Sequence, residues 1–192
     1  MGDTWEKGNP LRRIEPCDLL CALGIALNLT WCSLEGHSIG FELPSAGMSA
    51  VVNPRLFWLA GIAAVALCFL CAPQAIKARD GAMRFVVPLC AAAGTALFAW
   101  SFSQTMADPM LVAMLGVFLS GFGHFWFSAR YYLLLARMRP FTVIVWVIVA
   151  GLLAKTLLLS FSAMALPLEV QVGFAVLIPV ANALVFELAR DQ

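Results

Sequence analysis

The stretch Phe141–Ala165, FTVIVWVIVAGLLAKTLLLSFSAMA, decides the fold class of this chain. Lys155 is its one charged residue, and every other residue is apolar, small or carries only a hydroxyl. About 20 such residues are enough for a helix to cross the hydrocarbon core of a bilayer. A strand is excluded, because the stretch does not alternate apolar and polar residues as the strands of a membrane barrel do. The stretch therefore predicts a transmembrane helix.

The composition extends this prediction to the whole chain. The sequence has 192 residues, of which 62% are hydrophobic and 12% are charged. A soluble domain is roughly half apolar and a quarter charged, so a water-soluble core could not hide this much apolar surface. The formal net charge of +1 gives no support for direct nucleic acid contact by this segment. These values predict a polytopic membrane protein.

We expect an all-α integral membrane bundle of six transmembrane helices in residues 17–188, with short tails at 1–16 and 189–192. The first apolar run is expected to remain as a span, because Asp3, Glu6 and Glu15 dilute the positive charge that a cleaved signal peptide carries before it. The expected spans are Cys17–Leu34, Leu56–Ile76, Phe85–Ser103, Met110–Ala136, Phe141–Ala165 and Val170–Leu188.

The basic residues orient these spans. One side of the predicted membrane carries most of them, and the other side carries only Arg55 together with several carboxylates. Basic loops face the cytoplasm, so both termini are expected to be cytoplasmic in a multi-pass protein of the inner membrane. Three tryptophans at the predicted outer span ends, Trp31, Trp58 and Trp100, are expected to form an aromatic belt. The basic residues of the inner side are Lys7, Arg12, Arg13, Lys77, Arg79, Arg84, Arg137, Arg139 and Arg190.

Lys155 is the first candidate binding residue. A charge near the middle of a span is costly unless water, a polar group or an anion compensates it, and such residues are candidates for function. We expect Lys155 to anchor a cavity that opens outward and binds a small anionic ligand, with Asn28 and Trp31 as neighbours at similar depth. The alternative is that the lysine extends along the lipid surface toward the interface.

Two further spans carry candidate binding residues. Gly116, Ser120 and Gly123 recur at helical spacing, which is typical of membrane helices that pack closely. His124 and Arg130 lie on or beside this face and are expected to point into the bundle, lining a cavity or bonded within the protein. Asn182 follows Pro179, which is expected to kink the last span. On the first span, Cys21, Gly24, Asn28, Trp31 and Glu35 share one helical face.

No motif indicates an enzyme, a cofactor or a metal. Glu35, His37 and Glu42 fall in the predicted outer loop Glu35–Pro54, but their spacing fits no tetrahedral site, so a solvated loop is expected. Cys68 and Cys71 have the spacing of a redox pair inside a span, where free cysteine usually behaves as a small hydrophobe. Nucleophile elbows, phosphate loops and zinc-protease motifs are not found.

The layout resembles half of a major facilitator transporter. The connection Lys77-Ala-Arg-Asp-Gly-Ala-Met-Arg84 is similar to a loop of that family, although it lacks the leading glycine and the closing basic run. The stretch Cys17-Asp-Leu-Leu-Cys-Ala-Leu-Gly-Ile-Ala-Leu-Asn-Leu-Thr-Trp31 also resembles the facilitator-like membrane module of bacterial LuxR-type regulators. No residue role is carried over from either family.

These observations lead to one expected function and two alternatives. The expected function is binding or sensing of a small molecule, as the membrane input module of a regulator whose output domain is absent from this chain. One alternative is a small solute transporter, formed as a homodimer or with a second six-span half. The other is a membrane scaffold without a ligand. In each case the lipid bilayer is the principal partner.

Overall fold

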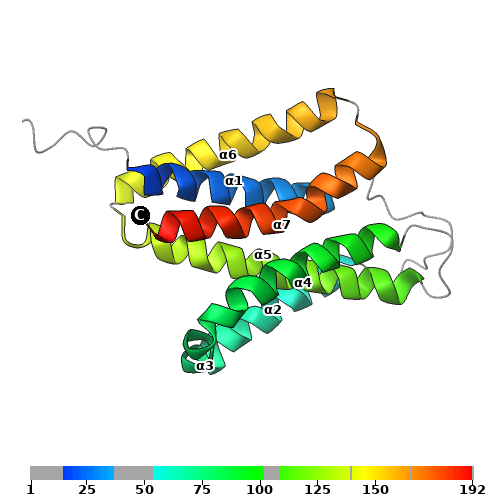
Figure 1. The fold of residues 1–192 in the computed structure, drawn as a ribbon, viewed down its shortest axis with the longest axis horizontal. Helices are drawn as coiled ribbons and strands as arrows, with labels where there is room; N and C mark the ends of the chain where they lie inside the picture. Colours follow the sequence, from blue (N-terminus) through cyan, green and yellow to red (C-terminus); the bar gives the residue numbers. More distant parts are fainter. Residues whose placement is uncertain (1–14, 37–53, 102–108, 139, 165, 192) are drawn as a thin grey trace, which may run out of the picture.

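The computed structural model describes residues 15–36, 54–101, 109–138, 140–164 and 166–191, and every regular element in these ranges is an α-helix (Figure 1). The prediction of an all-α chain is therefore confirmed for the part that the structure describes. In chain order the helices are α1 (Pro16–Gly36), α2 (Pro54–Cys71), α3 (Pro73–Ala78), α4 (Asp80–Trp100), α5 (Pro109–Leu135), α6 (Pro140–Ala163) and α7 (Leu168–Arg190).

Proline sets where most of these helices begin. Proline has no N–H to leave unsatisfied in a first turn, and its fixed φ suits that position. The same residue explains an error in the predicted second span, Leu56–Ile76. Pro73 ends α2 at Cys71 and starts α3, so the predicted single helix is two. The helices whose first residue is proline are α1, α2, α3, α5 and α6.

Five helices are long and apolar enough to cross a membrane, namely α1, α4, α5, α6 and α7. The shorter α2 is also apolar, over Arg55–Cys71. Large apolar side chains cover the outside of the bundle, as at Leu70, Leu159 and Leu177. Such a continuous apolar exterior is unusual for a protein surrounded by water and is typical of one that contacts lipid. The structure is therefore consistent with the predicted membrane class.

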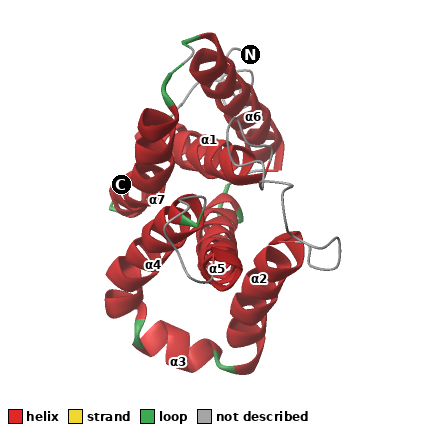
Figure 2. Cartoon of the chain, turned by 90° about the vertical axis from the view of Figure 1, so that its right-hand side faces the viewer, coloured by secondary structure: helices red, strands yellow, loops and turns green. Residues whose placement is uncertain are grey.

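The six longer helices form two groups of three. In one group α1 packs between α6 and α7, and in the other α5 packs between α2 and α4 (Figure 2). The groups meet where α4 contacts α7 and α1 contacts α5. If α1 is exchanged with α5, α2 with α6 and α4 with α7, these same pairs of helices remain in contact. The helices α1 and α5 run in opposite directions (Figure 1). This is the neighbour pattern of an inverted repeat.

Glycines bring α5 close to both of its neighbours. A Cβ placed on Gly116 would lie 2.6 Å from the backbone nitrogen of Phe98 in α4, and one on Gly123 would overlap Ala91. On the other side, Gly121 meets the backbone of Trp58 in α2, and Gly61 of α2 meets the backbone of Phe118. Small residues are thus required where these backbones cross. The predicted stripe of Gly116, Ser120 and Gly123 is confirmed as a packing face.

Candidate functional site: a buried polar cluster between α1, α4 and α5

The centre of this site is the carboxylate of Glu35. Glu35 lies in the last turn of α1, and its side chain extends between α4 and α5. Thr95 of α4 donates a hydrogen bond to Oε1 at 2.6 Å, and the hydroxyl of Ser120 of α5 contacts Oε2. The prediction that placed Glu35 in a solvated outer loop is therefore wrong. The helix continues through Glu35, while His37 and Glu42 lie outside the described residues.

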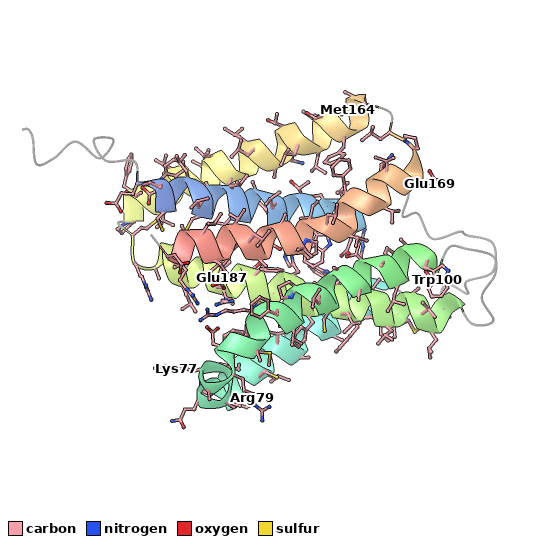
Figure 3. The ribbon with its side chains drawn as sticks, in the orientation of Figure 1. Lys77, Arg79, Trp100, Met164, Glu169 and Glu187 are labelled. Atoms are coloured by element: carbon pink, nitrogen blue, oxygen red, sulfur yellow. The ribbon has the colours of Figure 1, made fainter. Side chains whose placement is uncertain are left out.

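Trp31 completes the hydrogen-bonded chain. Its indole Nε1 donates to Thr95 Oγ1 at 3.0 Å, so the threonine accepts from the indole and donates to the carboxylate. The Trp31 side chain is fully buried, at 0% exposure. Its predicted place in an outer aromatic belt is therefore wrong, because the ring points into the bundle. Trp100, by contrast, is exposed at the end of α4 (Figure 3).

His124 lies between two tryptophan rings. Its ring centroid is 5.2 Å from that of Trp58 in α2 and 6.3 Å from that of Trp31 in α1. His124 Nδ1 is buried and has no hydrogen-bond partner in the described part of the chain. The expectation that His124 points into the bundle is confirmed. Trp58 also belongs to this cluster rather than to an outer belt.

Asn28 extends the cluster by two turns along α1. Its Nδ2 donates to Ser128 Oγ of α5 at 2.9 Å, so the amide nitrogen is paired across the helix contact. Its Oδ1 is buried and unpaired among the described residues. We call the set Asn28, Trp31, Glu35, Trp58, Thr95, Ser120, His124 and Ser128 the Glu35 cluster. Its unpaired Asn28 oxygen and its carboxylate are hydrogen-bond acceptors, and its rings can contact a cation.

The electrostatic surroundings of Glu35 differ from those of Asp80 and Glu187, which form ion pairs with arginine side chains. No ion pair found in the described ranges includes it, and both oxygens face neutral hydroxyls. Glu35 is half-buried, and a carboxylate that is partly removed from water without a cation loses hydration energy that two neutral hydrogen bonds replace only in part. The negative charge of Glu35 is therefore not compensated by the cluster, and a positive charge bound beside it would be stabilised.

A separate network of charges joins α4, α5 and α7 at the opposite end of the bundle. Asp80 of α4 accepts from Arg84 at 2.8 Å and from Arg130 of α5 at 3.2 Å, and Glu187 of α7 pairs with Arg84 at 3.5 Å. Each charge has at least one opposite partner, so these residues compensate one another. Figure 3 shows that the end of α7 with Glu187 lies on the same side of the bundle as Arg79, the residue just before α4.

Arg130 belongs to this charge network and not to the Glu35 cluster. Its guanidinium lies 4.1 Å from the centroid of Phe186 on α7, so an aromatic face also covers it. It points into the bundle, as expected. Asn182 contributes to the same helix contact: its Oδ1 accepts from the Tyr131 hydroxyl at 2.8 Å. Neither residue is within the hydrogen-bonded chain around Glu35.

Lys155 lies apart from both clusters. Its side chain is exposed on α6, whose buried face carries Trp146, Ala150 and Ala154 against α1. Asn28 and Trp31 instead bond toward α5 and α4. The structure therefore does not bring Lys155 together with its two predicted neighbours. The reason is that Lys155 lies on a different face of α6 from Trp146, Ala150 and Ala154, the residues that pack against α1.

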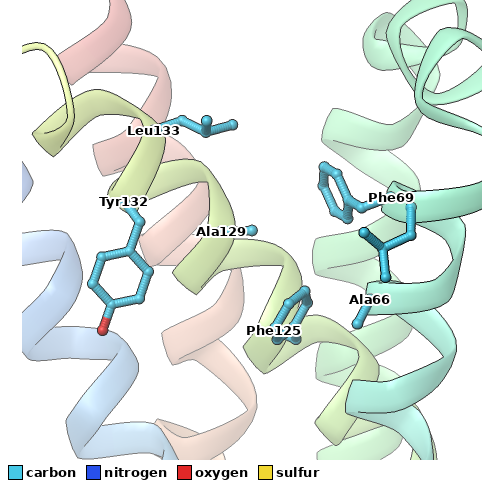
Figure 4. Close-up of a pocket in the computed structure, with 7 residues that line it drawn as sticks. Ala66, Phe69, Phe125, Ala129, Tyr132 and Leu133 are labelled. Atoms are coloured by element: carbon cyan, nitrogen blue, oxygen red, sulfur yellow. The ribbon is translucent and has the colours of Figure 1, made fainter.

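An apolar groove lies between α2 and α5, away from the Glu35 cluster. It has a volume of about 420 Å³, and Figure 4 shows Phe69 and Ala66 facing Phe125 and Ala129 across it. Its lining gives no polar anchor except the hydroxyl of Tyr132, which is exposed. The groove offers shape and apolar contact but no group that would orient a polar ligand.

Five members of the Glu35 cluster were not predicted as binding residues: Glu35, Trp58, Thr95, Ser120 and Ser128. One signal was present in the sequence, because Glu35 continues the helical face of Cys21, Gly24, Asn28 and Trp31. Thr95 is preceded by the small residues Ala91–Gly94, but its partner in another helix leaves no local pattern. Comparison with protein-family models, with curated proteins and with solved structures found no significant match.

Proposed function

We propose that this chain is a six-span inner-membrane protein that binds or senses a small molecule at the Glu35 cluster. In this proposal α2 is the sixth span, together with the five longer apolar helices. Both termini face the cytoplasm, since the end of the bundle that holds the start of α1 and the end of α7 also holds Lys77, Arg79 and Arg190. The Glu35 cluster then lies toward the outer side.

The observation that carries the proposal is the polar interior of a bundle whose exterior is apolar. Glu35, Thr95, Ser120, His124 and Asn28 come from three helices and converge where apolar packing alone would be more stable. Ionisable residues inside membrane bundles are candidates for ligand or ion sites by default. Because the unpaired Asn28 oxygen and the Glu35 carboxyl accept hydrogen bonds, the ligand is expected to carry hydrogen-bond donors rather than the negative charge first expected at Lys155.

The neighbour pattern favours a second candidate function, solute transport by two six-span units. Inverted repeats are common in secondary transporters, where the two repeats move against each other around a central site. Here the Glu35 cluster joins α1 to α4 and α5, and so lies between the two groups of three helices. The exposed Lys155 on α6 would then face a second unit or a cavity shared with it.

Cysteine accessibility tests the proposed site. Ser120→Cys would be placed in a variant without the six native cysteines and treated in membranes with a small, charged thiosulfonate reagent. We expect rapid modification, because a binding site must admit water and small solutes. Ala150→Cys is the matched control, since Ala150 is equally buried but packs in the apolar contact of α6 with α1. Equal, slow modification of both variants would contradict a small-molecule site at this cluster.

A further inference from the structure

The geometry around Glu35 points to a specific ligand for this carboxylate: we propose that Glu35 binds a proton when α1, α4 and α5 are packed together, and releases it when they separate. The inference deepens the proposed function, because it assigns a co-ligand to the same cluster. It rests on contacts of Glu35 alone and does not depend on the identity of any larger molecule.

The first argument is space. Both carboxyl oxygens are already in contact with protein, Oε1 with the Thr95 hydroxyl at 2.6 Å and Oε2 with the Ser120 hydroxyl. Thr95 is itself held by Trp31 Nε1 at 3.0 Å, and Thr95, Ser120 and Trp31 are all buried. Each oxygen of Glu35 therefore already has a neutral hydrogen-bond partner within the protein. A proton adds positive charge and requires no additional volume.

The second argument is charge. On α1 itself the titratable neighbour is Cys32, which carries no positive charge. From α5 the cluster receives His124, whose ring lies against Trp31 and Trp58 and whose Nδ1 is unpaired in the described part. Thr95 and the other α4 residues at this contact are uncharged, Lys155 of α6 is exposed, and Glu169 of α7 is another carboxylate. No ion pair found among the described residues includes Glu35.

The third argument is that the hydrogen bonds accommodate both protonation states. When the carboxylate is ionised, Thr95 and Ser120 both donate to it. When a proton from water binds Oε2, the new O–H donates to Ser120 Oγ. The Ser120 hydroxyl can then turn to a backbone carbonyl one turn earlier in α5, a common bond for serine within helices. The heavy atoms remain in place, so the packed helices can hold the neutral acid.

Release follows from the position of Glu35 near the end of α1. Its two hydrogen-bond donors belong to α4 and α5, while Glu35 belongs to the other group of three helices. Separation of the groups at this end removes both donors together and admits water to the carboxyl. Water stabilises the ionised form, and the proton returns to solution. Proton binding and helix packing are thereby linked, so each favours the other.

Infrared difference spectroscopy of the purified protein in lipid tests the inference. A protonated carboxyl has a C=O stretching band that a carboxylate lacks. We expect this band at neutral pH in the natural protein, its loss at alkaline pH, and its absence in Glu35→Gln. Glu187→Gln is the control: Glu187 forms an ion pair with Arg190 at 3.0 Å and lies outside the Glu35 cluster, so the band should persist.

Absence of the band from the natural protein at neutral pH would overturn the inference, as would its persistence in Glu35→Gln. If Glu35→Gln does not fold, Thr95→Val decides the question, because loss of the hydrogen bond to Oε1 must shift the band of a protonated Glu35; an unshifted band would contradict the assignment. These outcomes are independent of Ser120 accessibility. If the band is present but Ser120→Cys is modified only slowly, proton binding by Glu35 is supported and the small-molecule site is contradicted.

Discussion

At the scale of single residues, this chain uses two different ways to bury polar groups. At one end Arg84, Arg130 and Arg190 pair with Asp80 and Glu187, and the ion pairs between helices, at 3.2–3.9 Å, join α4, α5 and α7. At the other end Glu35 has only hydroxyl donors. The first arrangement is complete within the chain, whereas the second leaves a charge to be compensated. This difference is why the proposed site is assigned to Glu35 and not to the charge network.

Tyr131 gives a prediction at this scale. Its hydroxyl donates to Asn182 Oδ1 at 2.8 Å across the contact of α5 with α7, and both residues are buried. Tyr131→Phe is expected to lower the free energy of unfolding by about 1 kcal/mol, since the Asn182 oxygen loses its partner. Thermal unfolding in detergent measures the change. Tyr132→Phe is the matched control, because Tyr132 is exposed. Equal effects of the two substitutions would show that the bond contributes nothing.

Residues also show how far the sequence could predict the site. Asn28, Trp31 and His124 were found from depth and helical spacing, because polar groups within an apolar span are visible in the sequence itself. Thr95 and Ser120 were not, since their role depends on which helix lies opposite. Lys155 was predicted as a binding residue for the same reason as Asn28, because it is polar within an apolar span, yet it lies on the exposed face of α6. Hydropathy gives depth in the membrane but not rotation about a helix axis.

At the scale of helices, small residues determine which elements pack. Gly116 and Gly123 bring α5 against α4, and Gly61 and Gly121 bring α2 against α5. The sequence predicted the order and approximate lengths of the five long apolar helices, because length and apolarity are local properties. It did not predict the break at Pro73, because the apolar run continues on both sides of the end of α2. It also left open which helices meet the glycine stripe, since partners are far apart in the chain.

Glycine substitutions test this packing. Gly123→Leu is expected to destabilise the protein by about 1–3 kcal/mol, because the side chain would overlap Ala91 of α4 and force the helices apart. The apparent melting temperature in detergent reports the effect. Gly151→Leu provides the control, since nothing lies within 4 Å of a Cβ at that position of α6. A stable Gly123→Leu variant would mean that this face of α5 does not contact α4.

At the scale of the whole molecule, the two groups of three helices give the chain its organisation. The Glu35 cluster and the charge network both connect the groups, near opposite ends of the bundle. Movement of one group against the other would open one connection while the other stays closed. In the proposed orientation the ionic connection faces the cytoplasm, and the proton-binding connection faces outward. The whole account therefore depends on how the helices cross the membrane.

Side-specific labelling of single cysteines measures this orientation most directly. Ala78→Cys in α3 and Met164→Cys after α6 lie at opposite ends of the bundle, where both positions are exposed (Figure 3). Cys68 and Cys71 are also exposed and would be replaced with the other native cysteines. With a membrane-impermeant maleimide on intact cells, we predict labelling at position 164 and none at position 78 until the membrane is permeabilised. Labelling of position 78 in intact cells, or of both positions alike, would contradict the account.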